Sequence, residues 1–121
     1  ELADVVAREH GNIHRSGDLK AAALVRLLER CDAIRKPARF EEILLACECD
    51  ARGRLHFEAS AYPQRARLNA ALAAVQSVAT SVIAARAAAA GATGQKVGEW
   101  IHAARVEAVA AWPGLVDAGS A

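Results

Sequence analysis

The chain has 121 residues, of which 15 are basic and 14 acidic, and its formal net charge at pH 7 is +1. This length suits a single domain with its own core, and the near-neutral charge excludes a uniformly basic nucleic-acid binder while permitting a local basic patch. Hydrophobic residues make up 54% and aromatic residues 4%, so we expect small side chains, mostly alanine, on closely packed helices. Because no run alternates apolar and polar residues over six positions, the predicted fold class is all-α, a compact bundle of about five helices.

A short first helix is predicted from Leu2 onward, where apolar residues recur at intervals of three and four, and Gly11 is expected to interrupt or end it. His10 and His14 lie four residues apart, which puts both imidazoles on one face of a continuous helix. Two such histidines can share a metal ion, with Glu9 nearby as a helper. No third ligand lies in the local sequence, so the alternative, an ordinary pair of polar surface histidines, stays open.

Two further helices follow in the first half of the chain. Ser16 or Asp18 is expected to cap the second helix, and several leucines give that helix a broad apolar face. Pro37 cannot continue the second helix but suits the first turn of a third. The third helix places Phe40, Ile43, Leu44 and Cys47 on one face and Glu41, Glu42 and Glu48 on the other. Residues 52–63 have no periodicity, and long loops in compact domains tend to be functional.

A long fourth helix is predicted over residues 63–90, where nearly every residue is compatible with helix. The glycines of residues 91–94 break it, and Thr93 can cap a fifth helix. That helix carries an apolar stripe formed by Val97, Ile101, Ala104 and Ala108. Residues 113–121 are expected to form a flexible tail.

The cysteine pattern does not indicate a metal or redox site. Cys47 and Cys49 form C-x-C, whereas zinc and redox sites usually use C-x-x-C, so these residues and Cys31 are interpreted as small apolar positions on helices. The sequence contains neither a charged-then-apolar leader nor a run of 18 apolar residues, so no signal peptide or membrane span is indicated. The expected localisation is cytoplasmic. The first residues are already in helical rhythm without an initiator methionine, and we expect the natural chain to continue upstream.

Two basic clusters are candidate phosphate-binding sites. Arg35, Lys36 and Arg39 stand at the start of the third helix, where side chains and the free amides of the first turn can both donate to a phosphate. Arg52 and Arg54 flank a glycine, a spacing that lets two guanidiniums reach one acceptor group. The alternative is a set of salt bridges to Asp32, Asp50 and Glu58. The sequence contains no recognisable nucleophile–base–acid set and no Gly-rich phosphate loop, so no catalytic residue is assigned.

Four segments carry recognisable motifs in a fixed order. They are residues 7–14 around the two histidines, the D-A-x-R-K-P pattern of residues 32–37, the D-x-R-G-R pattern of residues 50–54 with F-E at 57–58 and Y-P-Q at 62–64, and the final helices at 76–78 and 94–110. From Glu1 to about Trp112 these motifs resemble the carboxy-terminal part of the bacterial multifunctional CCA-adding enzymes, which are tRNA nucleotidyltransferases with an HD phosphohydrolase domain. Some family members have Asp at the position of Gly11, and this departure weakens a metal-ligand role for His10.

The resemblance implies a division of the chain into three parts. Residues 1–16 correspond to the closing helix of the HD domain, residues 17–112 to a helical body and tail domain, and residues 113–121 to the flexible tail. The family adds C, C and A to tRNA 3′ ends with Mg²⁺ held by carboxylates in an upstream domain, and most of the HD domain with its divalent metal is also expected upstream. No cofactor is expected in this fragment, and the fragment alone is expected to be inactive.

In the family, the helical region after the HD domain supports the active domains and is expected to contact the tRNA acceptor arm. The resemblance therefore implies tRNA and the remainder of the parent chain as partners, with Arg35, Lys36, Arg39, Arg52 and Arg54 as candidate RNA-binding residues. Two alternatives belong to other classes. The alanine-rich fourth and fifth helices suit the seam of a homodimer in a protein-interaction module, and His10 with His14 suits a residual metal-dependent phosphohydrolase.

Overall fold

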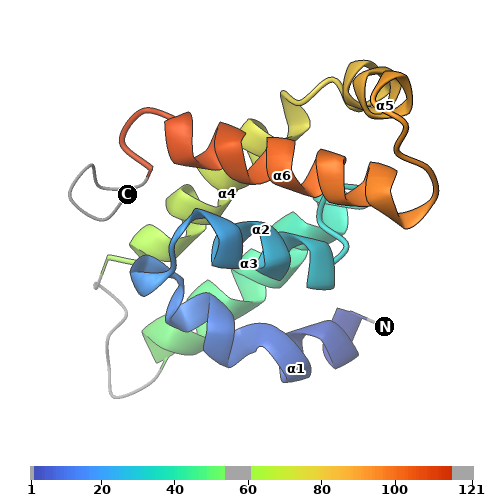
Figure 1. Ribbon diagram of the computed structural model, residues 1–121. Coiled ribbons are helices and arrows are strands. Elements are labelled where there is room, and N and C mark those ends of the chain that lie inside the picture. The colour runs from blue at the N-terminus through green and yellow to red at the C-terminus, as the bar shows by residue number, and fades with distance from the viewer. Residues whose placement is uncertain (1, 54–60, 116–121) are drawn as a thin grey trace.

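The computed structural model describes residues 2–53 and 61–115, and helices joined by turns account for nearly all of them. These residues form no strand, which confirms the all-α prediction, and they form six α-helices where about five were expected (Figure 1). In chain order the elements are α1 (Leu2–His14), the short 3-10 helix η1 (Ser16–Asp18), α2 (Ala21–Arg30), α3 (Pro37–Gly53), α4 (Pro63–Gln76), α5 (Thr80–Ala89) and α6 (Gln95–Ala111).

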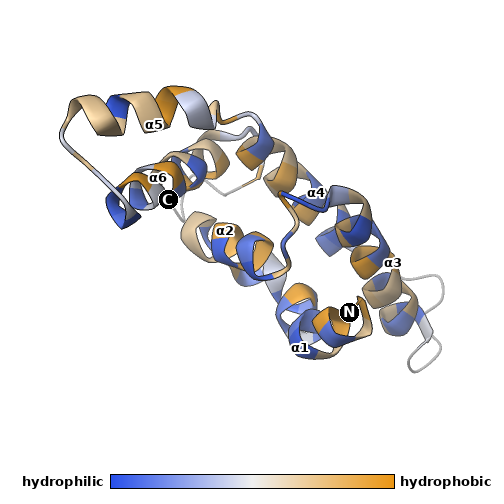
Figure 2. Cartoon of the chain, turned by 90° about the vertical axis from the view of Figure 1, so that its right-hand side faces the viewer, coloured by the Kyte–Doolittle hydropathy of each residue, from blue (hydrophilic) through white to orange (hydrophobic). Residues whose placement is uncertain are grey.

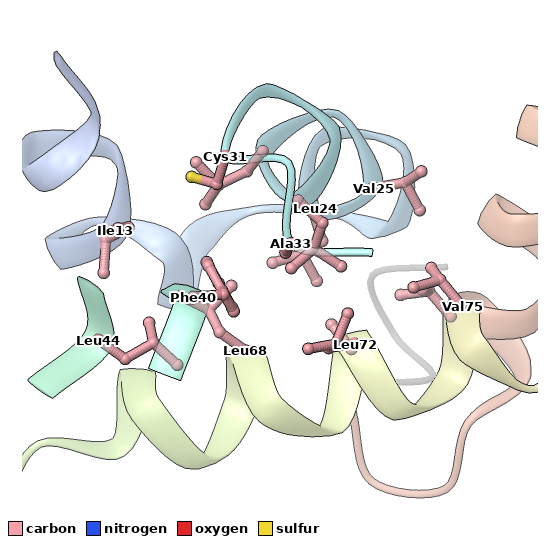
Figure 3. Close-up of a cluster of buried hydrophobic side chains, with 14 of the residues drawn as sticks. Ile13, Leu24, Val25, Cys31, Ala33, Phe40, Leu44, Leu68, Leu72 and Val75 are labelled. Carbon is pink, nitrogen blue, oxygen red and sulfur yellow. The ribbon is translucent and has the colours of Figure 1, made fainter. Parts of the chain in front are cut away.

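The core lies between α2 and α4 and extends to α1 and α3 (Figure 3). Leu24 and Leu28 of α2 are fully buried because their spacing of four places them on the same face of the helix. Leu68 and Leu72 of α4, also four residues apart, lie on the side of α4 that faces Leu24, and Phe40 of α3 lies beside Leu68 (Figure 3). Each fully buried leucine or phenylalanine contributes about 1.5–3 kcal/mol of transfer free energy, so these side chains fix how the helices pack.

The helices are not equally embedded in the fold. α1 packs on α3, and α6 crosses both α2 and α4. α5 has α6 as its main neighbour and lies at the end of the molecule opposite α1 (Figures 1 and 2). Among residues 2–53 and 61–115, no single helix is long and apolar enough to cross a membrane, and α4 with α5, bent by 50°, passes that test only as a pair.

The first helix is longer than the sequence indicated. α1 continues through Gly11 to His14, so the prediction that Gly11 interrupts or ends it is wrong. A glycine inside a helix costs about 1 kcal/mol relative to alanine. Val5 and Ile13 are buried in the core on one face of α1, and their burial offsets this cost.

The predicted cap of the second helix is also wrong. Ser16 and Asp18 form the separate helix η1, and α2 begins after Lys20 without a side-chain hydrogen bond at its cap. Ser16 is instead fully buried, and its carbonyl accepts a hydrogen bond from the Leu19 amide at 3.1 Å. The polar residues therefore turn the chain between α1 and α2 rather than start a helix.

The long helix predicted over residues 63–90 is two helices. α4 ends at Gln76 and α5 begins at Thr80. Between them the hydroxyl of Ser77 donates to the Ala74 carbonyl at 2.6 Å, a local bond of the kind that competes with helix continuation. The break allows α4 to line the core while α5 packs on α6.

The last helix faces the core with a stripe that only partly matches the predicted one. None of the four predicted residues, Val97, Ile101, Ala104 and Ala108, is fully buried, and of the four Ala108 packs beside the core. Val109 is fully buried, and Val106 and Trp112 also pack beside the core. Gly94 precedes α6 with φ 56°, and no side-chain hydrogen bond caps the helix, so the predicted Thr93 cap is wrong. The offset is about one residue, which rotates a side chain by about 100° around a helix.

Arg67 of α4 joins three segments that are distant in the sequence. Its guanidinium donates to the carbonyls of Ser16 at 3.1 Å and Leu19 at 2.8 Å, and also to the carbonyl of Leu115. All three of these acceptors are backbone carbonyls. The planar fork of arginine suits several fixed acceptors at once, so Arg67 holds η1 and the segment after α6 against α4.

We expect Arg67→Met to lower the free energy of unfolding by about 2 kcal/mol or more, because methionine keeps much of the stem but removes the hydrogen bonds of the guanidinium to three carbonyls. Urea denaturation followed by circular dichroism measures this loss. Arg26→Met is the matched control, since Arg26 is exposed on α2. Equal loss in the two variants would contradict the role of Arg67.

Candidate nucleic-acid interface

The first basic cluster is built on the turn between α2 and α3. α2 ends in a Schellman arrangement, in which the Ala33 amide donates to the Leu28 carbonyl at 3.0 Å and the Asp32 amide donates to Glu29 at 3.1 Å. Asp32 takes the left-handed conformation with φ 55°, a position where glycine is usual. Pro37 then starts α3 in a conformation its ring favours. The turn therefore brings residues 35 and 36 to the surface at the start of α3.

The three cations of this cluster have different environments. Arg35 has 74% of its side chain exposed and pairs with Asp32 at 3.1 Å, as the salt-bridge alternative predicted. Lys36 is exposed, and its carbonyl accepts the Phe40 amide at 3.0 Å. Arg39 is half-buried and donates to the Cys31 carbonyl at 2.9 Å. Arg39 therefore stabilises the turn, and Arg35 and Lys36 present their charges to solvent.

The second basic cluster lies at the other end of α3. Arg52 has 45% of its side chain exposed and pairs with Glu48 at 2.8 Å, not with Asp32 or Asp50. Glu48, placed on the polar face by its sequence pattern, is 8% exposed because Arg65 of α4 reaches it at 2.7 Å. The hydrogen bonds that Arg65 donates to Glu48 and then to Glu41 raise the pKa of Arg65. Arg54 and Glu58 lie outside the described residues.

The two clusters cannot contact the same phosphate. A helix rises about 1.5 Å per residue, so Arg39 and Arg52, 13 positions apart on α3, are separated by roughly 20 Å along its axis. A ligand that contacts both clusters must therefore be extended. A nucleic-acid backbone, with a phosphate at every nucleotide, has this property.

The two histidines do lie side by side on α1, with ring centroids 6.0 Å apart. Nδ1 of His10 donates to the carbonyls of Val6 at 3.0 Å and Ala7 at 3.2 Å, which leaves Nε2 as the lone-pair nitrogen. Both nitrogens of His14 have protein partners. Among residues 2–53 and 61–115, no group of three or more His, Cys, Asp or Glu side chains could hold a metal ion. These described residues alone do not form a complete metal site, and a role for the pair in a larger site stays a prediction.

His14 brings together two of the sequence motifs. Its Nδ1 lies 2.9 Å from the hydroxyl of Tyr62 and its Nε2 lies 3.4 Å from Asp50, while Gln64 donates to the His14 carbonyl at 2.9 Å. An ionised carboxylate only accepts, so in the neutral ring Nε2 carries the hydrogen and Nδ1 accepts the Tyr62 hydroxyl. Burial, and then neighbouring acidic groups, raise the pKa of Tyr62, which keeps the phenol protonated as a donor. These contacts hold α1 against α3 and α4.

A contact between α2 and α6 was not anticipated from the sequence. Glu29 accepts a hydrogen bond from Nδ1 of His102 at 3.0 Å and pairs with Arg105 at 3.5 Å. His102 is 73 residues from Glu29 in the chain, so no local pattern reveals the pair.

Two of the three cysteines agree with the apolar interpretation. Cys31 and Cys47 are fully buried, and burial raises the pKa of each thiol to about 11. Cys49 is exposed, so that part of the interpretation is wrong. All three are free thiols.

By fold and surface, the chain is an all-α domain with exposed cations at both ends of one helix. It is 81% identical to the multifunctional CCA protein of Acidovorax sp. strain JS42 over 112 residues. This match covers 93% of this chain and 26% of that protein. The multifunctional CCA protein of Polaromonas naphthalenivorans strain CJ2 is 73% identical over 90% of the chain. That of Variovorax paradoxus strain S110 is 70% identical over 94% of the chain. These identities confirm the resemblance that the motifs predicted.

The chain spans about a quarter of the length of the curated relatives it matches, 26% or 27% in the three proteins named. No protein-family model matches the chain. No solved structure matches it.

Glu9, the residue suggested as a helper for the histidines, is a buried carboxylate whose partners are Arg8, Asn12 and Arg30. It is 2% exposed and accepts hydrogen bonds from Arg30 at 3.2 Å and from Asn12 at 3.0 Å, and it pairs with Arg8 at 3.3 Å. Burial raises the pKa of Glu9, but the hydrogen bonds from Asn12 and Arg30 and the charge of Arg30 outweigh it, so the pKa lies below its ordinary value of 4.5. The ionised form therefore ties α1 to α2.

We expect Glu9→Gln to lower the free energy of unfolding by about 2 kcal/mol at pH 7, because bonds to a charged group are lost. A lowered pKa in the folded state means that this stabilisation is complete above the unfolded pKa, about 4.3, and is lost as the pH falls through the folded value. The difference between the two proteins should therefore shrink below about pH 4. Urea denaturation from pH 7 to pH 3 measures it, with exposed Glu42→Gln as the control. A difference that is constant with pH would contradict the ionised pair.

Proposed function

We propose that this chain is the tRNA-contacting and supporting segment of a CCA-adding tRNA nucleotidyltransferase. The observation that carries the proposal is the 81% identity, over 93% of the chain, to a multifunctional CCA protein. Nucleotide addition belongs, in this proposal, to the Mg²⁺-dependent domain of the longer enzyme. The 121 residues supply a helical support and part of the tRNA-binding surface, and they are inactive alone.

The environments of the basic residues support the proposal. Arg30, Arg65 and Arg67 are committed to internal acceptors, and they contribute to stability rather than to a free surface. Arg35 and Lys36 are exposed beside the first turn of α3. Phosphate recognition requires cations that can exchange a weak partner for a phosphate, and an exposed ion pair such as Arg35 with Asp32 contributes only about 0–1 kcal/mol.

The separation of the two clusters fits a double-stranded ligand better than a free nucleotide. Arg35 and Lys36 lie at one end of α3 and Arg52 at the other, more than 20 Å apart by the rise of a helix. The acceptor arm of tRNA is an A-form duplex, and such duplexes are recognised largely through their shape and backbone. We therefore propose that α3 lies along the acceptor arm and contacts its phosphates at both ends.

The proposal also assigns a place in the parent enzyme to each part of the chain, and a location in the cell to the enzyme. Residues 1–16 close the HD domain of the parent enzyme, whose divalent metal is held mostly by residues outside this chain, with His10 and His14 at its edge. Residues 17–112 form the body and tail region. The enzyme works in the cytoplasm, together with its tRNA substrate.

We expect the chain to bind fluorescently labelled tRNA with an affinity that falls linearly in logarithmic salt concentration, and anisotropy titrations across a salt series measure this. Arg35→Gln and Lys36→Gln should each lower the magnitude of the slope by about 1, because each removes one phosphate contact. Arg26→Gln removes one exposed charge from α2 and should leave the slope unchanged. Absence of binding at low salt would overturn the tRNA-contacting role, and equal slopes in all variants would overturn the assignment to Arg35 and Lys36.

Arg52 requires a second readout because it also holds Glu48. For Arg52→Gln we expect a smaller salt slope together with a lower thermal midpoint. A lower midpoint with an unchanged slope would assign Arg52 to stability alone. Circular dichroism at the titration temperature shows that each variant is folded.

A further inference from the structure

An open groove lies between α5 and α6, and we call it the α5–α6 groove. It is found at the end of the molecule opposite α1 (Figure 2). Two adjoining hollows of about 460 and 370 Å³ form it, and they share Ile83, Arg86, Ala104 and Glu107. The smaller hollow lies within the range of about 300–1,000 Å³ that is usual for sites that hold small ligands.

The smaller hollow has an exposed aromatic ring beside it. Trp100 lines this hollow and is 40% exposed, and it is the only aromatic residue among the large hydrophobic residues exposed in the described part of the chain. Glu107 lies two helical turns further along α6, and the side chains between them in the lining are the alanines 103 and 104. Seven residues of helix rise roughly 10 Å, so a planar ring that stacks on Trp100 can reach Glu107 with its edge.

The charged groups of the smaller hollow disfavour a phosphate and favour a ligand that donates hydrogen bonds. Glu99 and Glu107 line it together with Arg86, so carboxylates outnumber the cation by two to one. Glu99 pairs with Lys96 at 3.8 Å, whereas Arg86 and Glu107 make no hydrogen bond or ion pair with the described part of the chain. An ionised carboxylate only accepts hydrogen bonds, so a ligand that binds Glu107 must supply the donors.

Guanine is the RNA base whose edge matches a carboxylate. Its N1–H and its exocyclic amino group are adjacent donors, and together they can bond to the two oxygens of one carboxylate. Adenine and cytosine have their amino group beside an acceptor nitrogen, and uracil has one N–H between two carbonyls. Each of these three bases therefore places a lone pair against the carboxylate. Unpaired bases of RNA are commonly held in this way, by stacking on an aromatic ring and by hydrogen bonds to their edges.

We propose that the α5–α6 groove binds an unpaired guanine of an RNA. The base stacks on Trp100, its N1–H and amino group donate to Glu107, and Arg86 contacts an adjoining phosphate. The proposal rests on the proposed function, because tRNA, whose loops contain unpaired bases, is the RNA that supplies the guanine. It adds a base contact on α6 to the phosphate contacts proposed for α3.

The fluorescence of Trp100 tests this base pocket on the 121-residue chain. The chain has two tryptophans, so Trp112→Phe leaves Trp100 as the only reporter. A single-stranded hexauridylate that carries one guanosine should quench this fluorescence, because the base stacks on the indole. Inosine lacks the amino group, and in place of guanosine it should raise the dissociation constant about tenfold, since one hydrogen bond to a charged acceptor is lost. Equal dissociation constants would overturn the proposal.

Three variants assign the binding to individual side chains, and anisotropy of the labelled oligonucleotide measures them beside the unmodified chain. Glu107→Gln should abolish the preference for guanosine over inosine, whereas Glu42→Gln, at an exposed position of α3, should retain it. Trp100→Leu should weaken binding of the guanosine oligonucleotide about tenfold, because leucine keeps an apolar side chain but removes the stacking ring. Circular dichroism shows that each variant is folded. A preference that survives Glu107→Gln contradicts the assignment.

Failure of the base pocket and failure of the proposed function give different results. Arg35→Gln should lower the salt slope of tRNA binding and leave the ratio of the guanosine and inosine dissociation constants unchanged. A normal salt slope without discrimination between the two oligonucleotides would overturn the base pocket alone, and the groove would then suit a protein segment. Absence of tRNA binding at low salt would overturn the proposed function.

Discussion

A shortage of large apolar side chains is the constraint on which the rest of the structure depends. Phe40 is the only fully buried aromatic ring in the described part of the chain, and aliphatic residues, alanine and two cysteines fill the other core positions. Small side chains let helices approach closely but remove less apolar surface from water per residue. Polar contacts therefore complete the fold. Arg30 holds α1 through buried Glu9, Arg65 joins α4 to α3, and Arg67 fixes η1 and the segment after α6.

This constraint also decides which cations are available for function. The net charge is only +1, but the arginines fall into two groups. One group donates to internal acceptors, and the other is exposed. Arg39 and Arg35 illustrate the difference, because they are four residues apart and yet one donates to a carbonyl of the turn while the other is 74% exposed. Removing an internal arginine leaves buried acceptors without a partner, whereas removing an exposed one costs little stability. Stability and ligand binding can therefore be separated residue by residue.

The sequence predicts the helical class and the main core faces because these follow from local spacing, as for Leu24 and Leu28. It does not predict the break at Ser77, since residues 77–79 are compatible with helix and only the different neighbours of α4 and α5 require a bend. Glu48 is a similar case. The sequence predicted its position on the polar face of α3 correctly. Its burial, however, depends on a contact with Arg65, which lies 17 residues later in the chain. Partners of this kind are properties of the tertiary packing.

The same limit applies to the candidate sites, where residue types were recognised but helix phase was not. Ala108 of the predicted stripe of α6 packs beside the core, but the fully buried residue of that helix is Val109, one position later. The same side of α6 also meets Glu29 of α2 through His102. A change of phase by one residue turns a side chain by about 100° around a helix, so the spacing of apolar residues alone does not select the face that meets the core.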